Sequence, residues 1–163
     1  MKAANLCKTK YKLFNIMNKR VVIKDLEPKA YEAMFGLEKY LSQTKIEVSL
    51  RELIKIRVSQ INGCSYCIDL HTKDARKMGE TEQRIYALSA WRETPYFTPT
   101  EIAVLALAEE ITFINKGVSQ ATYDEALKVL DEHTLSQVIM AIVTINAWNR
   151  IAISTHMTPV LDQ

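Results

Sequence analysis

The amino-acid sequence predicts an all-α protein, a single-domain bundle of about six to seven helices. Glycine and proline number only four each in 163 residues, so the chain has few of the residues that separate short strands and turns. Runs that alternate apolar and polar residues with β-branched enrichment, which would indicate strands, are nearly absent. Several segments with apolar residues at helical spacing instead begin at recognisable helix start signals.

The first three predicted helices are marked by their ends. Pro28 suits the first turn of a helix, because the N–H that it lacks would be unpaired there. The segment Ser49-Leu50-Arg51-Glu52 fits a capping box, so we expect a second helix from Ser49 to the break at Asn62-Gly63. The third helix follows Ser65 and ends at Gly79, a residue typical of the position just past a helix.

The remaining four helices also have start signals. Thr81 caps a fourth helix that ends before Pro95, and Thr98-Pro99-Thr100-Glu101 combines a cap, a proline and a glutamate at the start of a fifth. Ser119 caps a sixth helix, and the last begins near Leu135. This last helix is apolar on all sides and must be covered on most of them. Because a small monomer has little chain to cover it, we expect a homo-oligomer.

The chain reads as one domain over residues 17–163, preceded by a short basic segment. Residues 1–16 contain no acidic residue and no continuous apolar stretch of the kind found in secretory signals. We interpret them as a loose basic leader, or as the result of a mis-assigned start with Met17 as the true initiator. Cys7 lies in this segment, where we expect it to be exposed and without a role.

Composition excludes several classes of partner. The net charge is only +2, and basic residues alternate with acidic ones along most of the chain, so nothing indicates binding to nucleic acid or to an acidic membrane. No apolar stretch reaches the length of a transmembrane helix. Three cysteines do not make a disulfide framework. We therefore expect a cytoplasmic protein.

The sequence Cys-x-x-Cys-x-x-x-His at residues 64–71 carries the chemical signal of the chain. Cys67 and His71 are four residues apart on the third predicted helix, so they share one face and lie within side-chain reach. Cys64 stands at the start of that helix, where unpaired N–H groups and the helix dipole favour a thiolate. The segment is typical of a redox dithiol with its own base.

Several interpretations of this segment compete. A zinc site needs a second pair of ligands, and Cys7, His133 and His156 are not paired at ligand spacing. A c-type haem needs histidine directly after the second cysteine, where Ile68 stands, and a thioredoxin-like dithiol follows a strand that this chain lacks. The cysteines and histidine could also simply be core residues. A dithiol enzyme on an all-α scaffold, such as a thiol peroxidase, fits best, and we expect no metal and no cofactor.

The motif resembles the signature of the AhpD-like alkyl hydroperoxidases of the carboxymuconolactone decarboxylase superfamily. Glu52 precedes Cys64 by eleven intervening residues, the lead-in Asn62-Gly63 is present, and the Cys-x-x-Cys-x-x-x-His segment follows. The resemblance covers the chain from about Met17 to its end, including the late Asn146-x-x-Asn149-Arg150 segment of the peroxidase-related branch. Tyr66 departs from the best-known AhpD enzymes, which have histidine between the cysteines.

The resemblance implies a mechanism in which Cys67 is the peroxidatic thiol and Cys64 the resolving thiol. Cys67 would attack a small hydroperoxide and become a sulfenic acid, and condensation with Cys64 would give a disulfide. An external dithiol, a lipoylated or thioredoxin-like protein, would restore the pair. His71 and Glu52 would form a proton relay, with the pKa of Cys67 lowered by about a unit or more. Family members commonly form trimers or hexamers.

Other roles stay open for several of these residues. Glu52 could simply close the capping box, and with His71 it could serve acid-base chemistry on a lactone, as in the decarboxylases. The chain could also be a non-enzymatic redox-sensing module. We assign Tyr66 only to the wall of the substrate pocket.

The polar residues of the last helix and the two tryptophans also carry expectations. Asn146, Asn149 and Arg150 are polar interruptions of that helix that either support the site or face the surface. We expect His133 to be solvated in a loop and His156 to lie near a frayed C-terminus. We expect two further residues, Trp91 and Trp148, to belong to the core.

Overall fold

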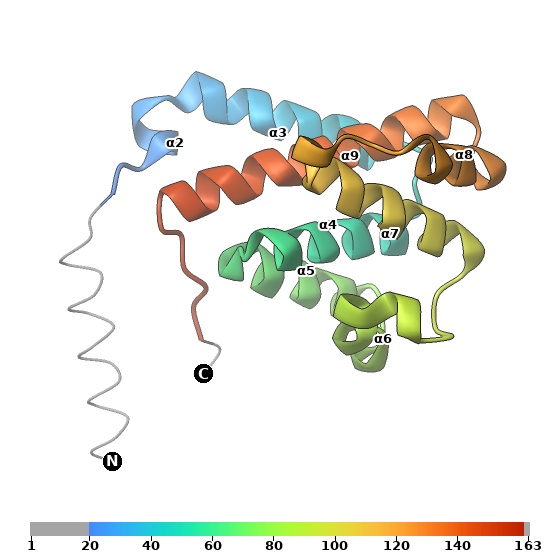
Figure 1. Ribbon diagram of the computed structural model, residues 1–163. Helices are drawn as coiled ribbons and strands as arrows, with labels where there is room; N and C mark the ends of the chain where they lie inside the picture. The colour runs from blue at the N-terminus through green and yellow to red at the C-terminus, as the bar shows by residue number, and fades with distance from the viewer. Residues whose placement is uncertain (1–19, 162–163) are drawn as a thin grey trace, which may run out of the picture.

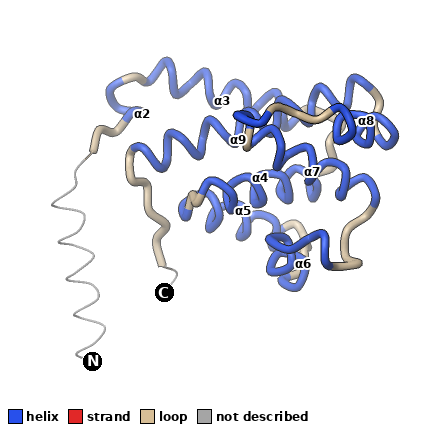
Figure 2. The backbone as a smooth tube through the Cα atoms, in the orientation of Figure 1, coloured by secondary structure: helices blue, strands red, loops and turns tan. Residues whose placement is uncertain are grey.

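The structure, a computed structural model, describes residues 20–161. In that range it consists of helices joined by loops, with no strand (Figures 1 and 2). The prediction of an all-α fold is confirmed, and all seven expected helices are present. A short additional helix and two 3-10 segments, η1 and η2, were not expected. In order, the elements are α2 (Ile23–Leu26), α3 (Pro28–Ser42), α4 (Val48–Asn62), α5 (Ser65–Lys77), α6 (Glu82–Ala87), η1 (Leu88–Glu93), α7 (Pro99–Thr112), η2 (Ile114–Lys116), α8 (Gln120–Val129) and α9 (Glu132–Ser154). The expectations for residues 1–16, Cys7 and Met17 fall outside the described residues.

Most of the predicted helix starts are confirmed by their caps. Thr98 and Glu101 form the expected capping box, and the side chains of Thr81 and Ser119 accept hydrogen bonds from the first turns of α6 and α8. The predicted start of α9 is wrong, because the carboxylate of Asp131 accepts the Thr134 N–H at 2.7 Å and begins the helix at Glu132. His133 therefore lies in the first turn of α9 rather than in a loop.

The predicted capping box at the start of α4 is wrong. The helix begins at Val48, one residue before Ser49, and its N-cap Glu47 makes no side-chain capping bond. Ser49 thus lies inside the helix, and the carboxylate of Glu52 is turned into the protein instead of back to the helix end.

Helix α4 is the centre of the bundle and buries two faces in two different cores (Figure 1). One face packs with α7, α8 and α9, through residues that include Ile54 and Val58. The other packs with α5, α6 and η1, through residues that include Leu53 and Ile56. Because both faces of α4 are covered, polar groups on it are held in fixed positions between helices, and these groups build the site described below.

Helix α9 is covered mainly by its own chain. It contacts α3, α4, α5, α7 and α8, and ten of its residues are buried. Val143 and Ile153 remain close to half exposed on it. The bundle therefore supplies most of the cover that the sequence suggested an oligomer would have to supply, and the trimer or hexamer stays a prediction. Between residues 20 and 161 no helix combines the length and apolar character needed to cross a membrane.

Candidate active site

The turn between α4 and α5 sets the two cysteines in place. Gly63 adopts a left-handed conformation with φ of 70°, which a residue with a side chain rarely adopts, and this ends α4. The Cys64 N–H donates to the Ser59 carbonyl at 3.0 Å, so the chain turns back at once. Cys64 becomes the N-cap of α5, and its sulfur accepts the Cys67 N–H at 3.4 Å. Both cysteines are buried free thiols.

His71 is bound to Glu52 across the α4–α5 interface. The imidazole Nδ1 and the carboxylate Oε2 lie 2.9 Å apart, and both side chains are buried. Burial alone would raise the pKa of Glu52, but the hydrogen bond with His71 and the charge of Lys55 outweigh it, and the pKa lies below its usual value. A carboxylate accepts but does not donate, so Nδ1 carries the proton and Nε2 of His71 is left able to accept one.

The Glu52 carboxylate belongs to a longer line of buried and partly buried charges. Its other oxygen lies 3.3 Å from Lys55 Nζ, which is also 3.3 Å from Oε2 of Glu38 on α3. The second oxygen of Glu38 accepts the indole N–H of Trp148 on α9 at 3.0 Å. Three helices besides α5 therefore hold the pair of Glu52 and His71 in its orientation.

The surroundings of the Cys67 sulfur favour the neutral thiol over the thiolate. Burial, followed by the hydrogen bond and the charge of Cys64, raises the pKa of Cys67 to about 12, and a hydrogen bond with Asn149 acts in the opposite direction. This is the reverse of the lowered pKa that the sequence suggested. The helix dipole and the histidine four residues away do not compensate for the loss of water around the sulfur.

A buried layer of amides lies behind the cysteines. The Asn149 side chain is fully buried, and its amide donates to Ser59 Oγ at 3.0 Å. Asn62 donates to Oδ1 of both Asn149 and Asn146, at 2.9 and 3.0 Å. Asn146 and Asn149 were expected either to support the site or to face the surface. Both are buried next to the site and do not face the surface. Arg150 binds the same network through Oδ1 of Asn146 at 2.9 Å.

A cavity of about 280 Å³ opens over Cys67 and His71. Tyr66 lines it as predicted, but three more aromatic side chains form its outer wall, and their rings pack edge to face or tilted at 5.2 to 5.5 Å between centroids. Trp148, expected to be simply core, is therefore a wall of this cavity. The lining residues are Tyr31, Phe35, Glu38, Lys55, Tyr66, Cys67, Leu70, His71, Asp74, Trp148, Ala152 and Met157.

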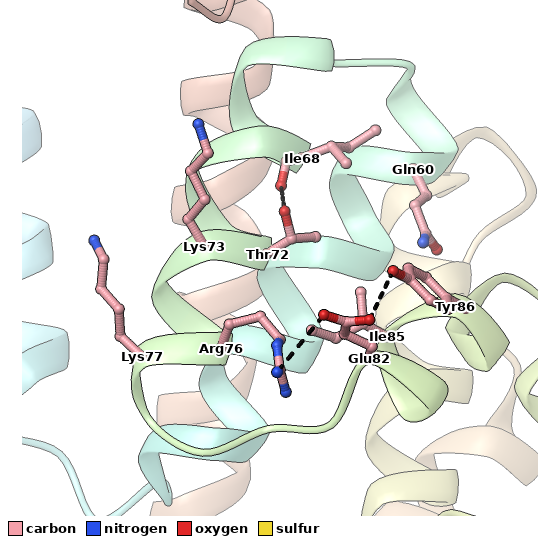
Figure 3. Close-up of a pocket in the computed structure, with 9 residues that line it drawn as sticks. All are labelled: Gln60, Ile68, Thr72, Lys73, Arg76, Lys77, Glu82, Ile85 and Tyr86. Carbon is pink, nitrogen blue, oxygen red and sulfur yellow. Dashed lines mark hydrogen bonds and ion pairs between the residues drawn. The ribbon is translucent and has the colours of Figure 1, made fainter. Parts of the chain in front are cut away.

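A larger cavity, about 890 Å³, lies elsewhere, on the outer side of α5 against α6 (Figure 3). Cys64, Cys67, His71 and Glu52 do not line it. In Figure 3 the Arg76 side chain turns toward Glu82, with which it forms an ion pair at 3.7 Å, and Tyr86 donates to the same carboxylate at 3.2 Å. These are surface contacts with neither the Cys64–Cys67 pair nor the pair of His71 and Glu52 beside them, so size alone does not make this cavity the site.

The structure places the four residues singled out in the sequence near one another: Cys64 bonds to the Cys67 N–H, Cys67 and His71 line one cavity, and Glu52 binds His71. Their roles stay a prediction. The sequence analysis missed Lys55, Glu38 and the aromatic wall. These groups reach the site only through the packing of separate helices, which the sequence does not reveal. The signal that could have found Lys55 is its position, one turn after Glu52 on the same helix. His133 and His156 lie at opposite ends of α9 and cannot join the cysteines as one ligand set.

The fold and the site define an all-α dithiol protein with a buried glutamate–histidine pair. Residues 28–110 match the carboxymuconolactone decarboxylase family, and the chain belongs to this family. It is 48% identical to the uncharacterized protein YdfG of Bacillus subtilis over 139 residues, which cover 85% of this chain and 95% of YdfG.

Solved structures support the AhpD-like resemblance. A protein of unknown function from Agrobacterium tumefaciens, a proposed antioxidant defence protein AhpD, matches with a TM-score of 0.84 and 34% identity, over 88% of this chain and 99% of that one. The debrominase Bmp8 has the same fold, with a TM-score of 0.72 and 20% identity over 84% of this chain and 74% of its own. Proteins of different activities therefore share this fold, and the fold alone does not select among them.

Proposed function

We propose that this protein is a thiol-dependent hydroperoxide reductase. The observation that carries the proposal is the meeting of three groups at one cavity. The Cys67 thiol and the His71 imidazole both line it, and Glu52 holds His71 from behind. A nucleophile, a base and a group that orients the base form the arrangement expected for activating a weak nucleophile.

In the first half-reaction, a small hydroperoxide binds in the cavity above Cys67. His71 accepts the thiol proton at Nε2 while Nδ1–H stays bonded to the Glu52 carboxylate. The Cys67 sulfur attacks one peroxide oxygen, the O–O bond breaks, and the leaving alkoxide takes a proton from His71 and departs as the alcohol. Cys67 is then a sulfenic acid, and attack by the Cys64 thiol forms the Cys64–Cys67 disulfide and releases water.

The raised pKa of Cys67 fits a site that is switched on by its substrate. A buried neutral thiol reacts slowly with oxidants and alkylating agents, because the thiolate is the reactive form. A peroxide that displaces solvent between Cys67 and His71 brings three groups together: the thiol that gives up the proton, the imidazole that accepts it and the peroxide oxygen that leaves. Proton transfer and attack can then occur in one step. Reactivity is then limited to molecules that fit the aromatic-walled cavity.

The other interpretations fit the site less well. Glu52 and His71 alone could serve acid-base chemistry on a lactone, but that reaction uses neither Cys67, which lines the cavity beside His71, nor Cys64, whose sulfur accepts the Cys67 N–H. The partners expected from the resemblance remain part of this proposal: an external dithiol that returns the disulfide to two thiols, a trimeric or hexameric assembly, and a reducing compartment such as the cytoplasm.

The test is a thiol count before and after one equivalent of a small organic hydroperoxide. The chain has three cysteines, so the wild type should fall from three free thiols to one, with the disulfide located by peptide mass spectrometry. Cys67→Ser should consume no peroxide. Cys64→Ser should complete one attack and carry a sulfenic acid on Cys67, detected with dimedone. Peroxide consumption by Cys67→Ser with label on Cys64 would reverse the assigned roles, and no thiol loss in the wild type would refute the function.

A further inference from the structure

The two cysteines open into different cavities. Cys67 lines the aromatic-walled cavity and Cys64 does not, whereas Cys64 lines a second cavity of about 220 Å³ that Cys67 does not reach. Ala152 and Met157 line both cavities and therefore lie between them. Together with the small buried cluster of Cys64, Cys67 and Ala152, these side chains separate the cavity at Cys67 from the cavity at Cys64.

Three helix ends build the cavity at Cys64. Gly63 ends α4, Ser65 begins α5, and residues 153–158 form the end of α9 and the chain that follows it. The last turn of α9 is closed by the Met157 N–H donating to the Ala152 carbonyl at 2.9 Å and by the His156 N–H donating to the Ile153 carbonyl at 3.2 Å. This is the hydrogen-bond pattern of a helix end that normally places glycine at the left-handed position.

His156 occupies that left-handed position, with φ of 55°. Within residues 20–161 it is the only residue other than glycine with a positive φ, and Gly63 and Gly79 fill the comparable positions at the ends of α4 and α5. A side chain is disfavoured there, and such strain collects at functional sites because the surrounding structure has to hold it. The strained residue is a histidine, and it lines the cavity that leads to Cys64.

From this arrangement we propose that the cavity at Cys64 is a separate port for the reductant, and that His156 serves it as the proton acceptor. The reductant class is a slender aliphatic dithiol, which attacks Cys64 Sγ while peroxide uses the other cavity. The proposal rests on the hydroperoxide reductase function, since that function makes the disulfide. It assigns to the peroxide reductase cycle a second entrance and a further residue, His156, which lies far from Glu52 in the sequence.

The geometry of thiol–disulfide exchange favours this port. An attacking sulfur approaches along the axis of the S–S bond, from the side away from the leaving sulfur. For attack on Cys64 with Cys67 leaving, that side is the one facing away from Cys67, where the second cavity lies. Cys64 is only 1% exposed, so a thiol fixed on a flat protein surface does not reach it, whereas a narrow alkyl chain fits a space of about 220 Å³.

The exchange balances in two steps. The first thiol of the reductant gives its proton to His156 and bonds to Cys64 Sγ, the Cys64–Cys67 bond breaks, and its electron pair leaves on Cys67, which takes a proton from solvent. The second thiol gives its proton to solvent and attacks the first sulfur of the reductant. Cys64 is released with the electron pair and recovers the proton held by His156. The reductant ends as a cyclic disulfide, and both cysteines are thiols.

The test separates reduction from peroxide chemistry by preparing the disulfide with diamide. Reduction by dithiothreitol is then followed by rapid alkylation and mass spectrometry of the peptide that carries Cys64 and Cys67. Ile153→Trp fills the cavity at Cys64 and should slow reduction at least tenfold. Val143→Trp is the matched control, since Val143 is exposed to a similar extent on the same helix and lines neither cavity. It should reduce at the wild-type rate.

His156→Gly distinguishes a chemical role from a structural one. Glycine suits the left-handed position, so the variant should melt at or above the wild-type temperature, yet its disulfide should be reduced several-fold more slowly. Wild-type reduction rates in both His156→Gly and Ile153→Trp would overturn the proposal. So would equal slowing of reduction and of peroxide oxidation by Ile153→Trp, because the two reactants would then share one entrance. Failure of peroxide to oxidise Cys67 would refute the proposed function while leaving this reduction assay readable.

Discussion

Two buried glutamates, Glu52 and Glu109, look alike in almost every local property. Each lies on a central helix with its side chain mostly buried, 4% exposed for Glu52 and 13% for Glu109. For each, burial by itself would raise the carboxyl pKa, and hydrogen bonds with charged or N–H partners lower it below its usual value. Neither burial nor the direction of the pKa therefore tells which of the two belongs to an active site.

The partners separate them. Glu109 accepts from the Arg57 guanidinium at 2.7 Å, from the Trp91 indole at 2.9 Å and from Arg92. None of these donors gives up its proton near neutral pH, so the cluster ties α4, η1 and α7 together and exchanges nothing. Glu52 holds a histidine, which can exchange a proton, and that histidine lines a cavity with a thiol. The comparison teaches that the identity of the donor distinguishes a carboxylate able to take part in proton exchange from one that only ties helices together.

The largest expected effect is on the rate of the Glu52→Gln variant. Gln can still accept a hydrogen bond from His71 but cannot stabilise its positive charge, so the rate of peroxide consumption should fall by about 100-fold or more. The melting temperature should change little, because Lys55 keeps its second carboxylate partner, Glu38. Single-turnover peroxide assays measure the rate, and thermal melts measure the melting temperature. A wild-type rate would remove Glu52 from the relay and end the distinction from Glu109.

Glu109→Gln should show the opposite pattern. The largely buried Arg57 guanidinium loses the charge of its acceptor, and the more exposed Arg92 loses an ion-pair partner, which should lower the free energy of unfolding by about 1–3 kcal/mol. The rate of peroxide consumption should not change. Urea denaturation measures the loss, and Glu125→Gln is the control, because its pair with Lys128 is exposed to solvent and should contribute little. A large loss of rate with no loss of stability would place Glu109 among the functional groups.

The same comparison shows how far the sequence could be interpreted. Helix ends marked by local chemistry were predictable, as at Thr98 and Gly63, since caps and left-handed turns involve neighbours in sequence. Cys64, Cys67 and His71 were predictable for the same reason, being within two turns of one helix. Glu52 was ambiguous, because a glutamate three residues after a serine satisfies a capping box as well as a relay. Only the packing of α4 on α5, which turns its carboxylate inward, decides between the two.

What could not be predicted depends on contacts across the bundle. Asn149 lies 82 positions after Cys67 in the sequence, and its bond to that thiol exists only because α9 packs against α4 and α5. The raised pKa of Cys67 likewise follows from burial, a property of the whole fold, and outweighs the local effects of a helix start and a nearby histidine. Local chemistry can name the reacting groups, whereas their protonation in the resting state follows from the tertiary structure.

The smallest expected effect concerns the thiol itself. Because the hydrogen bond and the charge of Cys64 raise the pKa of Cys67, Cys64→Ala should lower that pKa, and Asn149→Ala, which removes a bond acting in the opposite direction, should raise it. Below the pKa, each unit of pH changes the thiolate fraction about tenfold, and only the thiolate is alkylated. Iodoacetamide labelling of Cys67 in the wild type should therefore keep rising with pH through the alkaline range.

At a fixed pH of about 8, labelling of Cys67 should be several-fold faster in Cys64→Ala than in the wild type and slower in Asn149→Ala. Mass spectrometry of the separate peptides keeps Cys7 out of the measurement. A labelling rate for Cys67 that levels off near neutral pH would mean that the thiol is already ionised at rest. The site would then be activated before substrate binds. The cluster around Glu52, which can exchange a proton, would differ from the fixed cluster around Glu109 also by a charged Cys67 nearby. If both variants instead slow labelling equally, the substitutions act through packing of the small cluster around Ala152, and the opposing roles of Cys64 and Asn149 are refuted.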